Sequence, residues 1–547
     1  ETGTWPSHIL EHVALELLTL AGIPDGYGRA REAGPRGVYK VIISAPHPEV
    51  GRQALLTARE LVMAAIEDRP FDVAQATEDL TDLVDSRLVG PSTRAIVQAA
   101  WDSRRIPHIR LNDGNLVQLG HGAAQRRIWT AETDRTSAIA EGISKDKDMT
   151  KRLLANCGIP VPEGEVVDSP EAAWQAAQDI GVPVCVKPGD GNRARGVSLD
   201  LRDENDIKAA YAIALKQGDE VIVEKFIQGL EHRLLVVGDR LVAASRGETA
   251  SVIGDGTSTV RELVSAQINS DPRRGSGHAT SLTRIRFDDI ALSRLKMQGL
   301  TADSVPPVGQ RVVLRNNANL STGGTATDVT DDVHPEVAAR AVAAARMVGL
   351  DICGVDVICE TVLKPLEEQG GGIVEVNAAP GLRMHLAPSY GKPRAIGQAI
   401  VDRLYAHGQD GRIPVVAVTG TNGKTTVTRL IAHLMASSGL TVGMTNTDGV
   451  YVGGHCIDTG DCSGPKSARN VLAHPDVQAA VLETARGGLL REGLGVGLLK
   501  LGPLSFRLPV RRLAVELLSQ SLGLFELVQA RGLVRLRVLR FGGVGLQ

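Results

Sequence analysis

Short apolar runs alternate with longer amphipathic stretches along most of the chain. The run GVYKVIISA at 37–45 has the composition of a strand, and residues 49–66 after it have the apolar spacing of a helix. No internal repeat of fixed period accompanies this alternation. Alternating strands and helices predict an α/β fold with several domains.

The pattern breaks at a few places that we take as domain boundaries. We predict an N-terminal α/β domain over residues 1–132, a second α/β domain over 133–404 and a third, partial one over 405–495. The stretch HGQDGRIP at 407–414 is polar and contains glycine and proline, so it is typical of a linker before the strand VVAVTG. An anomalous tail over 496–547 follows.

The tail has an unusual composition. From Val496 to Gln547 the chain contains no Asp, Asn, Thr or His, while Leu, Val, Arg and Gly dominate. An α/β domain needs such residues for its turns and helix caps. Two interpretations stay open: a basic, apolar helical tail that packs on another surface, or out-of-frame translation of a GC-rich gene, which we favour.

Length, charge and cysteine content narrow the class of protein. With 547 residues, 43% hydrophobic content and a net charge of −3, the chain is long enough for several domains and has no overall electrostatic bias. Nucleic acid is therefore not an expected partner. Six scattered cysteines without a CxxC pair favour a reducing compartment. Without a long apolar run or signal-peptide pattern, we expect no membrane contact and a cytoplasmic location.

The second predicted domain carries the elements of a triphosphate site. Lys147 opens a predicted helix, Lys187 lies on the strand PVCVKP, and the loop GDGNRARGV at 189–197 is suited to fold over phosphates. The strand VIVEKFI follows, and its Glu224 and Lys225 have the place of the segment that binds an adenine and its ribose. These residues predict an ATP site.

Three oxygen-bearing side chains in the same domain predict a metal site. Asp356 lies in the strand GVDVI, and Glu375 and Asn377 lie in IVEVN. Because side chains two apart share one face of a strand, Glu375 and Asn377 point the same way. Hard oxygen ligands beside a triphosphate favour Mg²⁺. The alternative is that the two acids only pair with nearby lysines at a sheet end.

A second phosphate motif lies in the third predicted domain. The strand VVAV ends in GTNGKTT, and the amphipathic helix TRLIAHLMASSG follows. Backbone N–H groups around Gly420 and Gly423 would hold a phosphate, Lys424 would reach the β/γ oxygens, and Thr425 would contact Mg²⁺. The loop is shorter than the usual P-loop pattern, so the flanking strand and helix carry the prediction.

A third candidate site lies near the start of the chain. His8, His12 and Glu16 are spaced i, i+4 and i+8, so on a helix they project from roughly one face, with Glu11 beside them. The order H-x-x-E-H is the inverzincin arrangement, in which Zn²⁺ is held and Glu11 serves as the general base of a hydrolase. The alternative is a pair of histidines at a domain boundary.

Several of these runs resemble known families. The order DK, VKP, EKFI, GVDV and EVNAAPG is similar to the ATP-grasp ligases. The longer runs WPSHILEHVALEL, EHRLLVVG, SDPRRGSGH, NANLSTGGTATDVTD and EVNAAPGLRMHLAPS resemble the cyanophycin synthetase family over residues 1–495. The short GTNGKTT motif with LETARGG resembles the Mur-type amide ligases, in which Glu483 would bind the metal. One departure from the family pattern is Ala194, where the phosphate loop has a glycine.

The resemblance implies two coupled ligations that use ATP and Mg²⁺. The ATP-grasp domain would add L-aspartate to the C-terminal carboxylate of a poly-aspartate primer through an acyl phosphate, which Arg315 would clamp. Arg383 and His385 would hold a substrate carboxylate. The Mur-like domain would add L-arginine to aspartate β-carboxylates, an activity we expect to be impaired because the resemblance stops at Gly495. It also implies a homotetramer.

Two other functions share part of this evidence. Another ATP-grasp ligase, such as a glutamate- or D-alanine-adding enzyme, would carry the same metal and lysine set. A truncated, non-catalytic subunit that assembles with an intact one would carry the same long runs. Only those runs favour the cyanophycin-type ligase over the first alternative.

Overall fold

The chain folds as two compact units. The computed structural model describes residues 5–23, 26–34, 37–189, 196–271, 273–275, 282–315, 318, 320, 323–485, 487–488, 505–506, 525–530 and 533–538. One unit holds residues 1–119 and 126–410, and the other holds residues 120–125 and 411–547. Within the described residues, we find no helix whose length and apolar character would let it cross a lipid bilayer.

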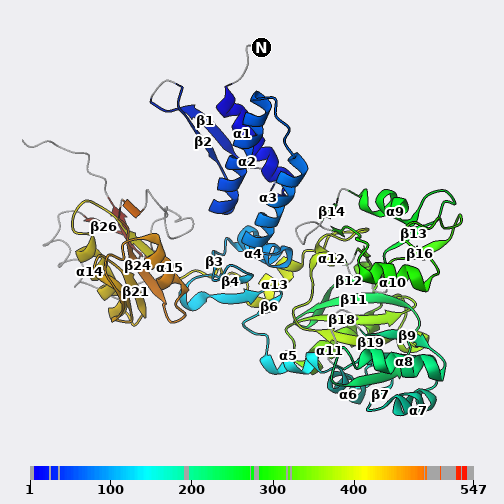
Figure 1. Ribbon diagram of the computed structural model, residues 1–547. Coiled ribbons are helices and arrows are strands. Elements are labelled where there is room, and N and C mark those ends of the chain that lie inside the picture. Colours follow the sequence, from blue (N-terminus) through cyan, green and yellow to red (C-terminus); the bar gives the residue numbers. More distant parts are fainter. Residues whose placement is uncertain are drawn as a thin grey trace, which may run out of the picture. The chain divides into compact units, whose positions relative to one another are not determined.

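The first unit begins with a helical layer against a hairpin. Its elements are α1 (Pro6–Leu20), β1 (Gly28–Glu32), β2 (Tyr39–Ile43), α2 (Pro48–Ile66) and α3 (Val73–Arg87). Helix α1 packs on both the hairpin and α2 (Figure 1). Alanines on the facing sides of α1 and α2, among them Ala14, Ala54 and Ala58, are fully buried and let the two helices approach closely. The predicted strand and helix in this region are confirmed.

A connecting layer joins this helical part to the rest of the unit. It comprises α4 (Pro91–Arg104), the antiparallel strands β3 (His108–Arg110), β4 (Leu116–Leu119), β5 (Arg126–Trp129) and β6 (Glu132–Thr133), and α13 (Ile396–Leu404). Arg104 of α4 forms an ion pair with Asp402 of α13 and donates to the Tyr405 carbonyl. The predicted boundaries at 132 and 404 therefore both fall inside one compact unit.

Two antiparallel sheets follow. The smaller has the order β7-β10-β8-β9 and is covered by two helices. Its elements are β7 (Gly164–Val167), α7 (Pro170–Ile180), β8 (Val184–Pro188), β9 (Ser198–Leu201), α8 (Glu204–Ala214) and β10 (Val221–Lys225). The larger has the order β17-β12-β11-β18-β19, with strands β11 (Leu230–Val237), β12 (Arg240–Glu248), β17 (Thr325–Asp328), β18 (Ile352–Cys359) and β19 (Gly372–Asn377).

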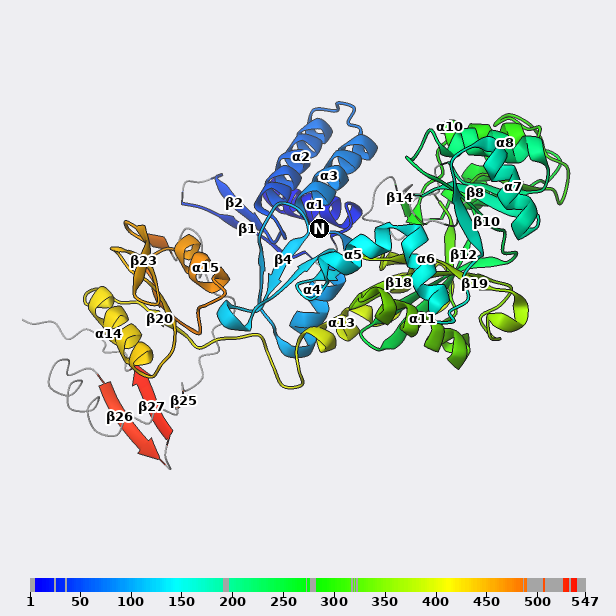
Figure 2. The same cartoon turned by 90° about the horizontal axis from the view of Figure 1, so that it is seen from below.

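The larger sheet is covered on both faces. Helix α11 (Pro335–Val348), together with α5 (Ala138–Lys145) and α6 (Lys147–Asn156), packs on the face that carries Leu234 and Val355 (Figure 2). Helices α4 and α13 pack on the opposite face, which carries Leu235 and Ile352. The short helix α12 (Arg383–Leu386) follows β19. Asp356 has the same strand parity as Ile352, so it faces the second side.

A small insertion with its own core separates β12 from β17. It contains β13 (Ser251–Ile253), α9 (Val260–Leu263), the π-helix η2 (Val264–Asn269), β14 (Arg274–Gly275), β15 (Leu282–Thr283), α10 (Asp289–Met297) and β16 (Arg311–Val313). Strands β14 and β15 pair in parallel.

The second unit is an α/β fold of its own. Its main sheet has the order β20-β24-β21-β22-β23, in which β20, β24 and β21 run parallel. Its elements are η1 (Gly122–Ala124), β20 (Val415–Val418), α14 (Lys424–Ser437), β21 (Val442–Thr445), β22 (Gly449–Val452), β23 (His455–Thr459), α15 (Pro465–Ala473) and β24 (Ala479–Glu483). The predicted strand and helix around GTNGKTT are confirmed.

The tail is described only in part. Its described residues form three strands, β25 (Ser505–Phe506), β26 (Phe525–Ala530) and β27 (Leu533–Val538), in an antiparallel sheet. These segments are strands rather than the helix that one of the two interpretations expected.

Candidate functional sites

A deep cavity lies between the two sheets of the first unit. Its volume is about 430 Å³. The smaller sheet contributes Cys185, Lys187 and Glu224 to its wall, and the larger sheet contributes residues from β11, β18 and β19. The predicted lysines and acids therefore meet in one place. The predicted loop at 189–197 lies largely outside the described residues.

The three predicted metal ligands share one face of the larger sheet. Asp356 of β18 stands opposite Glu375 of β19, and Asn377 stands opposite Gly354. A Cβ added at Gly354 would lie 2.8 Å from Pro380 Cβ, so the glycine leaves room for the turn that follows β19. All three oxygen-bearing side chains line the cavity. Two carboxylates and an amide on neighbouring strands form a donor set of the kind that hard divalent cations prefer.

Asp356 is a buried carboxyl with a raised pKa. The residue is 8% exposed. Burial raises the pKa of the Asp356 carboxyl to about 7, and the nearby Arg233, with Nη2 3.8 Å from Oδ2, offsets only part of this effect. A bound divalent cation would favour the ionised carboxylate, so the pKa shift fits a metal ligand.

The lysines form a compact cationic cluster. Glu224, 4% exposed, accepts from Lys187 Nζ at 2.6 Å and from Lys151. Although burial opposes ionisation, the two lysine charges hold the pKa of the Glu224 carboxyl below its usual value. Lys147 points to β19 instead, with Nζ 3.9 Å from Glu375 Oε1. The cluster keeps a net positive charge for an anionic ligand.

The predicted adenine segment is engaged with protein partners. The Glu224 carboxylate is held by lysines, and the Lys225 Nζ donates to the Gly181 carbonyl at 2.5 Å. The Lys225 backbone N–H donates to the Glu163 carbonyl. Roles of Glu224 and Lys225 in nucleotide binding therefore stay predictions, and Glu224 also has a clear role in orienting Lys187.

Sequence reasoning missed two residues of this cavity and one residue of the lysine cluster behind it. Glu231 and Arg233 lie on β11 and line it, with Arg233 in register with Asp356. Their spacing of two within the run EHRLLVVG was a readable signal. Lys151 lies one helical turn after Lys147, so helical periodicity could have placed both on one face.

The predicted substrate residues have different surroundings. Arg315 is 5% exposed, and its two Nη atoms donate to Asp288 at 2.6 and 2.9 Å. Asp288 also caps α10, so the Arg315 guanidinium holds the insertion together, and a role as a clamp for an acyl phosphate stays a prediction. His385 lines the cavity, and burial lowers the pKa of its imidazole to about 4. Arg383 lies beside the insertion and donates to Thr283 Oγ1 at 3.3 Å.

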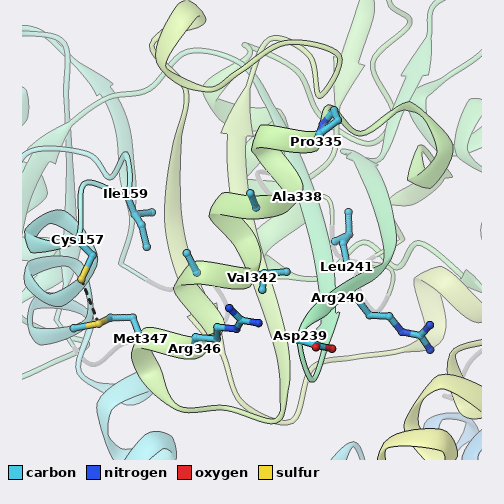
Figure 3. A pocket seen from close by; sticks show the side chains of 12 residues that line it. Cys157, Ile159, Asp239, Arg240, Leu241, Pro335, Ala338, Val342, Arg346 and Met347 are labelled. Carbon is cyan, nitrogen blue, oxygen red and sulfur yellow. Dashed lines mark hydrogen bonds between the residues drawn. The ribbon is translucent and has the colours of Figure 1, made fainter.

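A second, shallower groove lies away from these residues. It follows α11 and the end of α6 and has a volume of about 720 Å³ (Figure 3). Its lining is mostly aliphatic, with charge from Asp239, Arg240 and Arg346. Cys157 Sγ lies 3.4 Å from Met347 Sδ at one end. None of the predicted site residues lines this groove.

The second unit brings its predicted phosphate residues together. Gly420 and Gly423 have φ values of 157° and 73°, and Gly423 directly precedes α14. Thr425 Oγ1 donates to Glu483 Oε2 at 2.9 Å. Glu483 is 2% exposed, and its Oε1 has no hydrogen-bond partner among the described residues. A buried carboxylate oxygen that lacks a donor beside a phosphate loop fits a bound cation.

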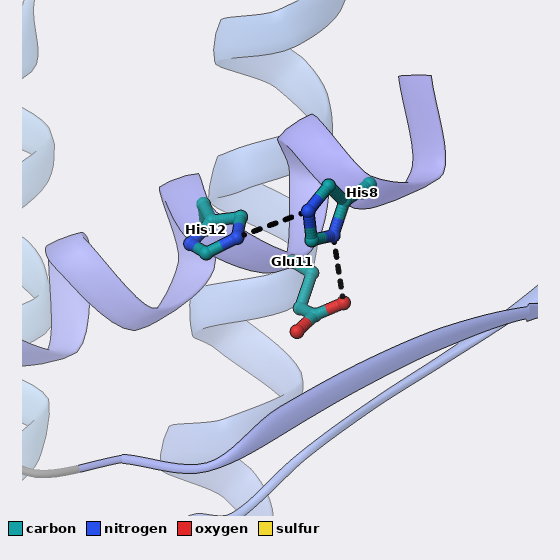
Figure 4. A group of neighbouring side chains, drawn as sticks. All are labelled: His8, Glu11 and His12. Carbon is teal, nitrogen blue, oxygen red and sulfur yellow. Dashed lines mark hydrogen bonds and ion pairs between the residues drawn. The ribbon is translucent and has the colours of Figure 1, made fainter. Parts of the chain in front are cut away.

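The histidine cluster of α1 differs from the prediction in one ligand. His8 Nε2 lies 3.3 Å from His12 Nε2, and His8 Nδ1 lies 3.4 Å from Glu11 Oε2 (Figure 4). Potential ligand atoms of His8, Glu11 and His12 all lie within 4.8 Å of one another. Glu16 is not in this group, because eight residues of helix separate it from His8 by about 12 Å along the axis.

Glu11 is held where it could act. It is 7% exposed and packs against Gly28 of β1, where an added Cβ would lie 2.6 Å from Glu11 Cγ. The glycine therefore leaves room for the carboxylate. Whether the group binds zinc stays a prediction.

Comparisons with known proteins agree with this architecture. Family models match a cyanophycin synthase-like N-terminal domain at residues 1–67, an ATP-grasp domain at 139–235 and a Mur ligase middle domain at 418–499. The cyanophycin synthetase of Nostoc sp. is 45% identical over 497 residues, which are 90% of this chain and 55% of that protein. The resemblance to cyanophycin synthetase is confirmed.

The match to cyanophycin synthetases covers only part of those proteins. The cyanophycin synthetase of Synechocystis sp. is 44% identical over 90% of this chain and 57% of its own length. The chain thus spans about half the length of the curated relatives it matches. A crystal structure of a bifunctional glutathione synthetase from Pasteurella multocida is 30% identical, covers 65% of this chain and 51% of that chain, and has a TM-score of 0.45.

Proposed function

We propose that the chain is an ATP-dependent ligase of the cyanophycin synthetase type, which adds L-aspartate to the C-terminal carboxylate of a peptide primer. One observation carries this proposal: oxygen-bearing side chains from β18 and β19 and the lysines Lys187 of β8 and Lys147 of α6 line one cavity. The similarity to cyanophycin synthetases supports the choice of aspartate and a primer as substrates.

Each group of residues has its own task in this ligation. Lys187, oriented by Glu224, and Lys147 would hold the transferring phosphate oxygens, so that the primer carboxylate meets the γ-phosphate in line. The resulting acyl phosphate would be attacked by the aspartate amine. The walls of the cavity would keep water from the activated carboxyl group.

Asp356, Glu375 and Asn377 would hold Mg²⁺. An ATP-grasp domain uses ATP with a divalent metal, and the oxygen donor set of this site suits Mg²⁺. The ion would neutralise charge that develops on the phosphates.

The main test is aspartate-dependent turnover. The purified chain is incubated with ATP, Mg²⁺ and a synthetic primer, and ADP release is measured with and without L-aspartate while mass spectrometry follows primer length. We expect ADP release and elongation to require aspartate. Equal stimulation by glutamate or D-alanine would favour another ATP-grasp ligase, and no stimulation by any amino acid would refute a ligase.

We infer that the second unit binds a second nucleotide, with Gly420, Gly423 and Lys424 on its phosphates and Thr425 and Glu483 on Mg²⁺. The hydrogen bond between Thr425 and the buried Glu483 supports this inference. In a full-length enzyme of this type, the unit would serve the addition of L-arginine to aspartate side chains.

Replacement of Lys424 by alanine tests the second nucleotide site. Calorimetric titration with a non-hydrolysable ATP analogue and Mg²⁺ should give two bound nucleotides per wild-type chain and one per variant, because the phosphates lose their cation. Lys466→Ala, an exposed position on α15, serves as the control and should retain both. A wild-type stoichiometry of one that Lys424→Ala leaves unchanged would contradict this assignment.

We also propose that His8 and His12 hold Zn²⁺ with Glu11 close enough to activate water, so that the N-terminal part can cut polymer into primers. The grouping of their donor atoms supports this proposal. His12 is exposed, which leaves one side of the group open to substrate.

Metal analysis tests the zinc proposal. After loading with Zn²⁺ and gel filtration, mass-spectrometric metal analysis should find about one zinc per wild-type chain and almost none in His8→Ala or His12→Ala. His47→Ala is the matched control, because His47 only caps α2 through a bond from the Glu49 N–H. Zinc that stays bound in both cluster variants would show that it sits elsewhere.

A further inference from the structure

Arg274 is a buried cation in the insertion between β12 and β17. It lies on β14 and is 6% exposed. Its backbone N–H donates to the Asp271 carbonyl at 2.9 Å, and β14 pairs with β15 so that Arg274 stands opposite Leu282. Fixed backbone contacts on both sides set the direction of the side chain.

Only part of the hydrogen-bonding capacity of the Arg274 guanidinium is used by the described residues. Nη1 donates to the carbonyls of Thr283 at 2.6 Å and Gly323 at 3.0 Å. Within the described residues, Nε is buried without a hydrogen-bond partner, and no carboxylate lies within ion-pair distance of Arg274. Asp271 is already paired with the neighbouring Arg273. A buried charge without a counter-charge is costly, so an anion from outside the chain would stabilise it.

A second guanidinium converges on the same residue. Arg383 of α12 donates from Nη2 to Thr283 Oγ1 at 3.3 Å, while Arg274 binds the carbonyl of the same residue. Burial lowers the pKa of Arg383, and the charge of Arg274 lowers it further, which shows that the two cations are close. Burial also lowers the pKa of Arg274. Two cations brought together in this way form an anion site more readily than either alone.

Arg274 and Arg383 lie beside the cavity between the two sheets of the first unit. Helix α12 carries Arg383, and its next two residues, Met384 and His385, line the cavity that holds the predicted metal ligands. The phosphate-binding lysines belong to other elements, β8 and α6. An anion at Arg274 and Arg383 would therefore be a part of the substrate other than the triphosphate.

We propose that Arg274 and Arg383 form a subsite that binds a carboxylate of the incoming dicarboxylic amino acid. This inference rests on the proposed ligase function. Planar guanidinium forks match the planar carboxylate and hold it by paired, charge-assisted hydrogen bonds. A carboxylate fixed there would leave the amine of the same molecule to be directed at the activated primer.

Kinetics with varied aspartate test the subsite. With ATP and primer saturating, Arg274→Gln should raise the KM for aspartate about 10- to 100-fold, as expected for loss of hydrogen bonds to a charged group, and should leave the KM for ATP unchanged. Arg274→Lys should recover part of the loss. Arg284→Gln, an exposed position directly after Thr283, is the matched control and should behave like the wild type.

A binding probe separates this inference from the proposed function. Succinate carries two carboxylates and no amine, so it should compete with aspartate in the wild type and lose about tenfold in potency in Arg274→Gln. An unchanged KM for aspartate with a lowered melting temperature would overturn the subsite and make Arg274 structural. If the wild type shows no aspartate-dependent turnover, the ligase proposal fails, and calorimetric titration of succinate then decides the subsite by presence or absence of binding. If Arg274→Gln does not fold, Arg274→Lys and Arg383→Gln carry the same comparison.

Discussion

Replacement of Asp356 by asparagine is expected to lower aspartate-dependent ADP release by about 10²- to 10³-fold. Asp356 is the most buried of the three proposed metal ligands and stands directly opposite Glu375. Asparagine keeps the size of the side chain but removes the charge that would hold a divalent cation. Initial rates at increasing Mg²⁺ concentration measure the effect, and the variant should need much more Mg²⁺ for half-maximal turnover.

The Asp356→Asn variant should lose turnover without losing stability. Burial raises the pKa of this carboxyl to about 7, so ionised Asp356 weakens the metal-free fold at neutral pH. We therefore expect the variant, without metal, to melt no lower than the wild type. Glu360→Gln, an exposed carboxylate just beyond the end of β18, should change neither property. Turnover within twofold of the wild type in Asp356→Asn would refute the metal site.

Replacement of Glu224 by glutamine is expected to cost about 3 to 5 kcal/mol in the free energy of unfolding of the ligase unit. Glu224 is the carboxylate between two buried lysines, Lys151 and Lys187. Glutamine would leave both ammonium groups in a buried site without a counter-charge. Thermal and urea unfolding followed by circular dichroism measure the loss.

A second substitution makes the origin of this loss testable. In the Glu224→Gln background, Lys151→Met removes one unpaired charge and should restore part of the stability. Glu220→Gln, an exposed acid just before the same strand, is the control and should change the free energy by less than about 0.5 kcal/mol. If Glu224→Gln costs less than about 1 kcal/mol, the lysines are solvated and the buried cluster does not hold Lys187 in place.

Features that depend on local chain geometry were predictable from the sequence. The motif GTNGKTT lies between strand β20 and helix α14, as predicted. This placement was predictable because the turn and the start of the helix depend on residues within the motif itself. Period two along IVEVN placed Glu375 and Asn377 on one face, as the structure shows. The alternation of short strands and helices likewise predicted the α/β class.

Features that depend on pairing between distant segments were not predictable in the same way. Arg315 precedes a glycine-rich run in sequence, yet its guanidinium is bound by Asp288 from the start of α10. Arg233 reaches Asp356 only through the register of β11 and β18. On α1, the axial rise of the helix places Glu16 too far from His8 to share an ion with it. Packing of Glu11 against Gly28 of β1 instead places its carboxylate beside the two histidines.

The sequence by itself determined which reactive groups this chain carries and predicted what they do: two motifs of the phosphate-binding type, a set of oxygen-bearing side chains and a histidine motif, each recognised by residue type and short-range spacing. Only the tertiary structure decided which charges share a cavity, because strand register and helix packing join residues that lie far apart in the chain. Lys151 meets Glu224, and Arg274 and Arg383 both bind Thr283, through such contacts. The energy of a buried charge depends on its neighbours, and those neighbours exist only once the chain has folded.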